Sequence, residues 1–321
     1  MDYGFLFHYG TLGLTIAATS VGAGIGEGMA GVAAIKALDR QPHSYNDILR
    51  LSIITTALIE TTAVIGLFIA MMLLLGTPKE PAAYTFIAEI GIGFALCFSG
   101  LVIGIASGFP AQEAIFALAR QPLMAPKILG FTIITQALVQ TPIIAGFVVA
   151  LLIKNFALTA DTLPEALRLI AAGLCVGIGG IGPSIGLARF AQQASRALGL
   201  CKEAYERILS FSLVSQTLIE TPLIFALVIS LIIFFVIPPL DDTQLLTGIG
   251  TLAAALAAGL GTLGTGISSG AVAGAVCEKL ATDETAKALP RTSMFAQALI
   301  ETTTIYAILV SLTILFLCKN L

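Results

Sequence analysis

The sequence has no tryptophan, only two histidines and few charges, and these absences exclude several classes of protein. Only 11% of its 321 residues are Asp, Glu, Lys or Arg, whereas soluble domains usually carry about 25%. The five cysteines form no CxxC motif, and His8 lies far from His43, so no metal site is predicted. The net charge of −3 says nothing about a nucleic-acid partner, and the sequence has no basic cluster that would indicate one.

Long apolar runs take the place of charge. Hydrophobic residues make up 57% of the chain, and the mean hydropathy is +0.98. The runs are long enough for helices, which need roughly 20 residues to cross a bilayer, and too long for barrel strands of about 10 residues. We predict an all-α integral membrane protein with eight transmembrane helices, over residues 9–38, 46–76, 82–118, 127–154, 165–198, 205–237, 243–280 and 290–317.

A repeat of about 80 residues runs through the chain. The stretch ALIETTAVIG at 57–66 recurs as ALVQTPIIAG, TLIETPLIFA and ALIETTTIYA at 137–146, 217–226 and 298–307. The first helix of each unit is rich in glycine, as in GAGIGEG at 22–28. Two helices per unit make the repeats parallel, which argues against an inverted-repeat transporter. The predicted hairpins are hairpin 1 (residues 1–80), hairpin 2 (81–160), hairpin 3 (161–240) and hairpin 4 (241–321).

The positive charges indicate how the hairpins are oriented. Most of the sixteen Lys and Arg residues lie around the turns within the hairpins, and the connectors between hairpins, including Lys79 and Glu80, are short and acidic or proline-rich. The positive-inside rule therefore places the hairpin turns in the cytoplasm and both termini on the outer face of the cell membrane. The first ten residues show no cleavage site, so we interpret them as the lead-in to an uncleaved helix.

One position of the repeat carries an acid near the middle of the membrane. Its occupants are Glu60, Gln140, Glu220 and Glu301. A charge at this depth costs about 2.5–3.5 kcal/mol. An apolar setting favours the protonated carboxyl and a nearby cation favours the carboxylate, so the group can take up an ion and release it. The three Glu residues are predicted to bind an ion, and Gln140 to be silent; the alternative is a protonated Glu that only joins helices.

Distance from the hairpin turn pairs each acid position with a residue at equal depth on the first helix. These pairs are Glu27 with Glu60, Ser107 with Gln140, Pro183 (beside Ser184) with Glu220, and either Ser268 or Ser269 with Glu301. A threonine follows every acid position, as Thr61, Thr141, Thr221 and Thr302. Each threonine hydroxyl either serves the ion site or bonds back to its own helix. A carboxylate pair with a hydroxyl suits Na⁺ or a shared proton.

The glycine-rich stretch GEGMAG at 26–31 fits G-x-G-x-x-G but lacks the strand that a nucleotide loop requires. A loop at membrane depth would also leave backbone groups unsatisfied. Small residues along a membrane helix instead allow close helix packing. We therefore predict that the four glycine-rich helices form an inner wall and that the bulkier helices lie outside.

The combination resembles the rotor-ring proteolipid, or c subunit, of F-type ATP synthases. It consists of the glycine motif, the mid-membrane Glu and an Arg-Gln-Pro turn, which occurs as Arg40, Gln41 and Pro42 and again as Arg120, Gln121 and Pro122. The resemblance covers essentially the whole chain, as four fused hairpins. The fusion, the missing acid and LPRT at 289–292 are also similar to proteolipids of V-type and archaeal ATPases, whereas Arg-Gln-Pro favours the F-type.

The resemblance implies a non-catalytic membrane component without a cofactor, which carries only the transported H⁺ or Na⁺. It implies several copies in a ring surrounded by lipid, with the glycine-rich helices inward. An Arg on the a subunit of the stator would contact the Glu, and the Arg-Gln-Pro turns would contact the central-stalk subunits on the cytoplasmic side. It also implies three ATP per turn, so a ring of m chains, with 3m acids in 4m hairpins, would use m ions per ATP.

By the family pattern, a Na⁺ site combines an oxygen of the first helix with the Glu, a following hydroxyl and a Tyr. Hairpin 4 fits best, and hairpin 1 offers a carboxylate pair, which favours Na⁺ over H⁺. The candidate ligands are Glu301, Thr302, Thr303 and Tyr306 with Ser268 or Ser269 in hairpin 4, and Glu27, Glu60 and Thr61 in hairpin 1. The turn of hairpin 3 lacks Arg-Gln-Pro and is expected to be longer.

Two other functions stay open at this point. A secondary transporter or channel could relay protons through the carboxylates, and it would need broken helices, for which Pro142 and Pro222 are candidates. A structural bundle or pore would need no ion turnover. An assembled ring of several chains would favour the rotor, and a monomer would favour the transporter.

Overall fold

The computed structural model describes residues 3–78, 81–283 and 286–319, so Lys79 and Glu80 of the first connector lie outside the described residues. The described part is helical and contains eight segments long and apolar enough to cross a membrane, as predicted. The α-helices are α1 (Tyr3–Arg40), α2 (Tyr45–Leu75), α3 (Thr85–Ala88), α4 (Ile90–Arg120), α5 (Ala125–Val139), α6 (Thr141–Ala157), α7 (Leu163–Gly179), α8 (Ile181–Leu200), α9 (Tyr205–Phe235), α10 (Leu245–Thr282) and α11 (Leu289–Lys319).

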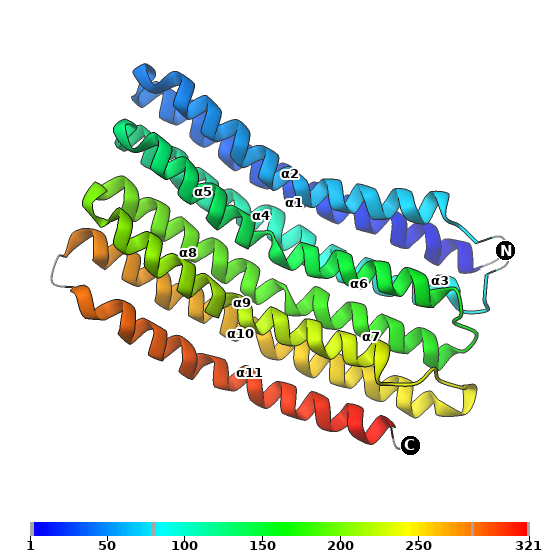
Figure 1. Ribbon diagram of the computed structural model, residues 1–321. Helices are drawn as coiled ribbons and strands as arrows, with labels where there is room; N and C mark the ends of the chain where they lie inside the picture. Colours follow the sequence, from blue (N-terminus) through cyan, green and yellow to red (C-terminus); the bar gives the residue numbers. More distant parts are fainter. Residues whose placement is uncertain (1–2, 79–80, 284–285, 320–321) are drawn as a thin grey trace.

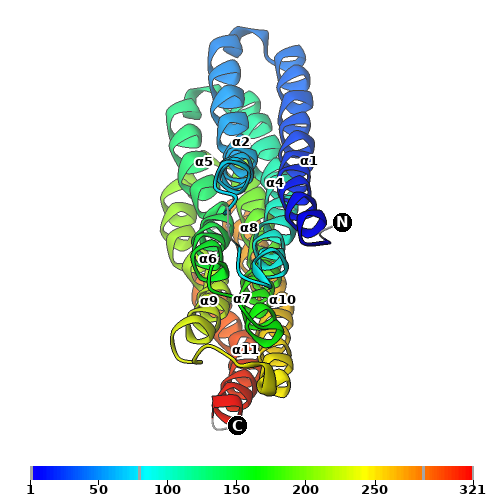
Figure 2. The same cartoon turned by 90° about the vertical axis from the view of Figure 1, so that its right-hand side faces the viewer.

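The helices form two layers. The first helices of the hairpins, α1, α4, α7 with α8, and α10, pack directly against one another and form what we call the first-helix layer. The second helices, α2, α5 with α6, α9 and α11, pack mainly on this layer and form the second-helix layer, as Figure 2 shows. The prediction that the glycine-rich helices form one wall and the bulkier helices another is confirmed within the chain.

All four hairpin turns lie at one end of the molecule, and the connectors between hairpins lie at the other end together with the start of α1 and the end of α11 (Figure 1). The inner hairpins are the most enclosed: the span Leu163–Leu200 is the most buried and the span Leu289–Lys319 the most exposed. Both outermost hairpins therefore present long apolar faces to their surroundings.

The hairpin turns share one construction. Each contains a 3₁₀ turn, and in the first two hairpins a proline occupies the first position of that turn, where its missing N–H costs nothing. These turns are η1 (Pro42–Ser44), η2 (Pro122–Met124), η3 (Lys202–Ala204) and η5 (Ala286–Ala288), and η4 (Asp242–Gln244) lies in the last connector. The expectation of a longer third turn was wrong, because Cys201–Ala204 spans as many residues as Gln41–Ser44.

Two of the transmembrane segments are interrupted near their middle. The α5–α6 break falls at Gln140 before Pro142, and the α7–α8 break falls at Gly180 before Pro183. Proline removes an N–H and clashes with the carbonyl four residues earlier. The break at Pro142 was expected from the sequence, and the break at Pro183 was not. Pro222, the other candidate for a break, lies inside the continuous helix α9.

The carbonyls freed by these two prolines are both satisfied by threonine hydroxyls. Thr141 Oγ1 donates to the carbonyl of Leu138 at 2.8 Å, and Thr262 Oγ1 of α10 donates to the carbonyl of Gly179 at 3.2 Å. A polar backbone group without a partner costs several kcal/mol in hydrocarbon. The hydroxyls therefore stabilise bends that would otherwise be costly at this depth.

Glycine sets the spacing within the first-helix layer. A side chain at Gly22 or Gly26 would collide with the α4 backbone at Gly100 and Gly104. The same holds between α8 and α10, where Gly186 lies against Gly266. Helices this close gain dispersion contacts that lipid tails cannot supply. These contacts hold α1 in register with α4, and α8 in register with α10.

Two buried ion clusters fasten the connector end. Glu89 contacts Nδ1 of His8 at 2.5 Å and Nζ of Lys154 at 3.1 Å, which joins hairpin 1 to hairpin 2. In hairpin 3, Arg168 pairs with Glu165 and donates to the carbonyls of Ile233 and Ile237 at 2.8 and 2.9 Å, across to the end of α9. Each cluster holds a second helix to a first helix where no hairpin turn does so.

We expect Arg168→Met to destabilise the protein by about 3–5 kcal/mol, because it leaves the Glu165 carboxylate buried without its cation. Thermal unfolding in detergent, followed by circular dichroism, measures the effect. The control is Lys127→Met, which removes an exposed 3.6 Å pair with Glu206 and should cost less than about 1 kcal/mol. Equal losses in the two variants would contradict the role of Arg168.

Candidate functional site

The four acid positions lie at one level in the second-helix layer. Glu60 is at the centre of α2 and Glu220 at the centre of α9. Gln140 occupies the α5–α6 break, midway along the span Pro122–Ala157, and Glu301 lies near the middle of α11. A membrane that covers these helices evenly therefore has its centre close to this level.

Contacts within the hairpins bear out the depth pairing. In hairpin 2, Nε2 of Gln140 donates directly to Oγ of Ser107 at 3.1 Å. In hairpin 4, Thr304 donates to Thr265 at 2.8 Å, a register that places Ser268 level with Glu301. The side chain of Ser268 is nevertheless exposed, whereas that of Ser269 is buried and its hydroxyl has no hydrogen-bond partner among the described residues.

Glu27 and Glu60 form the carboxylate pair of hairpin 1. Gly26, the residue before Glu27, packs against Ile59, the residue before Glu60, so the two helices are level here. Two carboxylates at the same level on neighbouring helices repel each other when both are charged. Glu27 is partly buried and Glu60 is exposed at the edge of the chain. Such a pair favours uptake of a shared proton or a cation, which removes the repulsion.

Gln140 is held in a closed hydrogen-bond network. Its Oε1 accepts from Thr62 Oγ1 of hairpin 1 at 3.0 Å, while its Nε2 donates to Ser107 of its own hairpin. Ser107 also offers its carbonyl to Nε2 of Gln136 at 2.8 Å. The carboxamide thus makes the donor and acceptor contacts that a protonated carboxyl could make, without a proton to lose.

The other two acids, Glu220 and Glu301, have fewer hydrogen-bond partners than Gln140. Glu220 is partly buried and lies beside Thr141 of hairpin 2, whose hydroxyl proton is donated to the Leu138 carbonyl. Glu301 has a buried Oε1 without a hydrogen-bond partner among the described residues. A buried polar oxygen without a partner is costly. This oxygen is therefore the strongest candidate for a proton or a bound cation in hairpin 4.

The threonines that follow the acid positions bond back to their own helices. The acceptor carbonyls lie 2.5 to 3.1 Å away, in the pairs Thr61 with Leu58, Thr141 with Leu138, Thr221 with Thr217, and Thr302 with Leu299. Thr303 donates likewise to Ile300 at 2.9 Å, and Tyr306 is 65% exposed. Within the single chain these groups are not gathered around Glu301, so their role as ion ligands stays a prediction.

Comparison with known proteins identifies the family. The family of ATP synthase C subunits matches the chain four times, over residues 11–73, 90–153, 170–233 and 252–314. The chain belongs to the ATP synthase C-subunit family. Its four family repeats coincide with the four hairpins.

Similar proteins occur in archaea and bacteria. The chain is 36% identical over 129 residues to the K subunit of the A-type ATP synthase of Methanocaldococcus jannaschii, which covers 40% of this chain and 54% of that protein. It is 46% identical over 61 residues to the ATP synthase c subunit of Syntrophomonas wolfei and 36% over 78 residues to that of Prochlorococcus marinus. These matches cover 19% and 24% of this chain, and 85% and 96% of the relatives. The chain thus spans about half of the archaeal relative.

The Arg-Gln-Pro turns of this C-subunit family member lie at the hairpin-turn end, far from the acid level. Arg40 and Arg120 are exposed at the ends of α1 and α4, with Arg40 over the ring of Phe116 and Arg120 3.6 Å from Glu113. The turns therefore present cations at an end of the molecule that a partner could reach.

Sequence reasoning missed a set of glutamines one turn from the acid position. Gln136, Gln216 and Gln297 each precede it by four residues, are fully buried, and have an Oε1 without a hydrogen-bond partner among the described residues. Nε2 of Gln297 reaches Ser215 of the neighbouring hairpin at 3.3 Å. The repeat of Gln in three hairpins was the available signal in the sequence, and hairpin 1 has Thr56 instead.

Thr62→Val should destabilise the protein by about 1–3 kcal/mol, because it leaves Oε1 of the buried Gln140 without its donor. Thermal unfolding in detergent measures the change. Thr56→Val on the same helix is the matched control, since Thr56 bonds only to its own helix and its loss should cost less than about 0.5 kcal/mol. A loss no larger than that of the control would show that the Thr62–Gln140 contact does not join the hairpins.

Proposed function

We propose that this chain is an ion-translocating subunit of the rotor ring of a rotary ATP synthase or ATPase, with no active site of its own. The observation that carries the proposal is the common level of Glu60, Gln140, Glu220 and Glu301, one in each family repeat and each near the middle of its transmembrane span. Reversible binding of H⁺ or Na⁺ at the three carboxyls would couple ion flow to rotation of the ring.

The chemistry follows from what surrounds each carboxyl. In an apolar setting the group favours the neutral, ion-loaded form, and beside a cation of the stator it favours the free carboxylate. Glu220 has Thr141 as a neighbour, and Glu301 has an oxygen without a partner among the described residues. Ion binding therefore neutralises a buried carboxylate. Release of the ion requires a nearby cation, and the described residues place none at the acid level.

Gln140 would pass the stator without exchanging an ion. Its contacts to Thr62 and Ser107 already satisfy the carboxamide, so this position resembles a permanently loaded site. A ring of m chains then has 4m hairpins and 3m exchanging acids. At three ATP per turn, each ATP takes m ions, and each ion yields about 2.3 kcal/mol per 100 mV. Fewer acids per ring suit a high membrane potential or ATP-driven pumping.

Head-to-tail closure of the ring would complete the site of hairpin 1. Within the chain, Thr62 follows its acid by two residues and donates to the acid position of the next hairpin. Thr303 occupies the same place in hairpin 4 and is exposed at one edge, while Glu60 is exposed at the other. On ring closure the Thr303 hydroxyl of one copy would turn from the Ile300 carbonyl and donate to Glu60 of the next copy, in the role that Thr62 has toward Gln140.

The proposed setting is the cell inner membrane. The hairpin turns would face the cytoplasm, where Arg40, Arg120 and their Gln-Pro neighbours would contact the central stalk, and both termini would face outward. The a subunit of the stator would supply the cation opposite the carboxyls. The Arg-Gln-Pro turns support an F-type complex, and the carboxylate pair of hairpin 1 supports Na⁺.

A transporter or channel would need broken helices, and the chain has helix breaks at Gln140 and Gly180. The alternative of a transporter or channel is therefore tested together with the rotor. The carbonyls that these breaks free are satisfied by Thr141 and Thr262, however, and so do not offer ligands to a substrate. The parallel orientation of the four hairpins also differs from the inverted repeats of many transporters. Both features favour the rotor.

Labelling of the purified oligomer with dicyclohexylcarbodiimide, followed by intact mass spectrometry and peptide mapping, tests the proposal. We expect modification of three carboxyls per chain, at Glu60, Glu220 and Glu301, because the reagent reacts with protonated carboxyls in apolar surroundings. Protection by Na⁺ but not by K⁺ would identify the ion as Na⁺. A purified protein that stays monomeric, or labelling at none of the three, would overturn the rotor assignment.

Two variants control this experiment. Glu220→Gln should lower the label from three to two per chain, and Gln140→Glu should raise it to four, since Ser107 and Thr62 surround that position as they would a loaded carboxyl. An unchanged count in both variants would show that the reagent modifies other groups, Glu27 among them.

Thr303→Val tests the head-to-tail contact. It should alter the labelling rate at Glu60 about two- to tenfold, the value of one hydrogen bond, without changing the rate at Glu220. Rates resolved by peptide supply the comparison within one sample. Thr302→Val is the matched control, because Thr302 also bonds to its own helix but does not occupy the repeat position equivalent to Thr62. An effect at Glu301 in place of Glu60 would refute the contact.

A further inference from the structure

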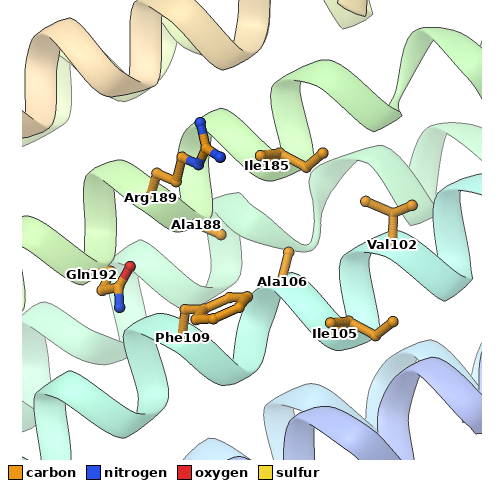
Figure 3. Close-up of a pocket in the computed structure, with 8 residues that line it drawn as sticks. All are labelled: Val102, Ile105, Ala106, Phe109, Ile185, Ala188, Arg189 and Gln192. Atoms are coloured by element: carbon orange, nitrogen blue, oxygen red, sulfur yellow. The ribbon is translucent and has the colours of Figure 1, made fainter.

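The first-helix layer contains a groove between α4 and α8. Gly22 and Gly26 of α1, like Gly182 and Gly186 of α8, let the next helix approach closely. The corresponding positions of α4 in the repeat are Val102 and Ala106, and beside them a groove of about 440 Å³ separates α4 from α8. Figure 3 shows the groove, lined by Val102, Ile105, Ala106 and Phe109 of α4 and by Ile185, Ala188, Arg189 and Gln192 of α8. Its volume is in the range of ligand sites.

One cation, Arg189, and one amide, Gln192, lie in this mostly apolar groove. Arg189 follows Pro183, which is level with the acids, by six residues, or about 9 Å along α8. By the same measure, the other Lys and Arg residues of the described helices lie roughly 13 Å or more from the acid level. Arg189 is therefore the deepest cation that the structure describes, inside a hydrocarbon core whose half-thickness is about 15 Å.

Arg189 has no anionic partner within the described residues. Arg189 is exposed on α8 and takes part in none of the ion pairs among the described residues. Glu113 of α4 lies at a similar depth, but it pairs with Arg120. A cation at membrane depth is costly unless it is paired or reaches the head-group region. In Figure 3 the Arg189 side chain points along α8 toward Ile185, so an anion that pairs with it has to reach this depth of the groove.

We propose that the α4–α8 groove binds an anionic phospholipid. Its phosphate would accept hydrogen bonds from the Arg189 guanidinium, whose planar fork suits two phosphate oxygens, and from the Gln192 amide. An acyl chain would lie along Val102, Ile105 and Ala106. A free phosphate ion would satisfy Arg189 but leave these apolar walls uncovered, so the two features together favour a lipid. The proposal depends on membrane insertion and not on ion translocation.

A second groove in the first-helix layer provides a comparison within the molecule. It lies between α1 and α4, has a similar volume of about 460 Å³, and is lined by apolar residues with Thr11 as its one polar member. Lacking a cation, it should accept an acyl chain without preference for the head group. Selectivity for an anionic head group is thus assigned to Arg189.

Native mass spectrometry of the purified oligomer tests the proposal, with phosphatidylglycerol or phosphatidylcholine of matched chains added to the delipidated protein. We expect phosphatidylglycerol to be retained more strongly, and Arg189→Gln to weaken its retention about tenfold or more, the value of a charge-assisted hydrogen bond. Arg196→Gln is the matched control on the same helix, and it should change retention less than twofold, because Arg196 does not line the groove.

Ala106→Leu tests the apolar half of the groove by filling it while Arg189 is kept. It should reduce retention of phosphatidylglycerol. If Arg189→Gln does not assemble, the Ala106→Leu variant still tests whether the groove binds the lipid. Arg189→Lys should keep part of the selectivity. Equal retention of the two lipids by the native protein would overturn the proposal, as would unchanged retention in Ala106→Leu. Displacement of phosphatidylglycerol by inorganic phosphate alone would show a simple anion site in place of a lipid site.

Discussion

A polar side chain at the centre of an apolar bilayer must be neutral, paired or hydrogen-bonded, and the rest of this structure depends on how that requirement is met. The four repeats meet it in different ways. Gln140 is neutral and hydrogen-bonded through both its oxygen and its nitrogen, Glu220 lies beside Thr141, and Glu60 lies level with Glu27. Glu301 keeps a buried oxygen without a partner among the described residues. A family repeat that looks uniform in sequence thus provides four different environments.

These environments exist because the first-helix layer is rigidly spaced. Glycine contacts between α1 and α4 and between α8 and α10 fix the depth of each helix against the next. The second helices pack on that layer, so their acid positions come to one level without direct contact between most of them. The prolines bend two segments at this level, and threonine hydroxyls compensate the broken backbone bonds. Spacing, bending and polar satisfaction are therefore parts of one arrangement.

The chain belongs to the ATP synthase C-subunit family and contains four copies of the family repeat that differ in sequence. Fusing four hairpins allows each interface to carry its own residues. The interface of hairpins 1 and 2 carries the Thr62–Gln140 contact, and that of hairpins 2 and 3 contains a groove with a deep arginine. A ring built from identical single hairpins could not place either feature at one interface alone.

The sequence alone determined the membrane class, the eight spans, the four hairpins, the level of the acids and the pairing of Ser107 with Gln140, because these follow from apolar run length, repeat spacing and helical rise. It did not determine which face of each helix is buried. The choice between Ser268 and Ser269, the break at Gly180, the buried glutamines and the Arg189 groove depend on contacts between hairpins that are distant in the chain. Only the tertiary structure brings those surfaces together, since packing and not periodicity decides them.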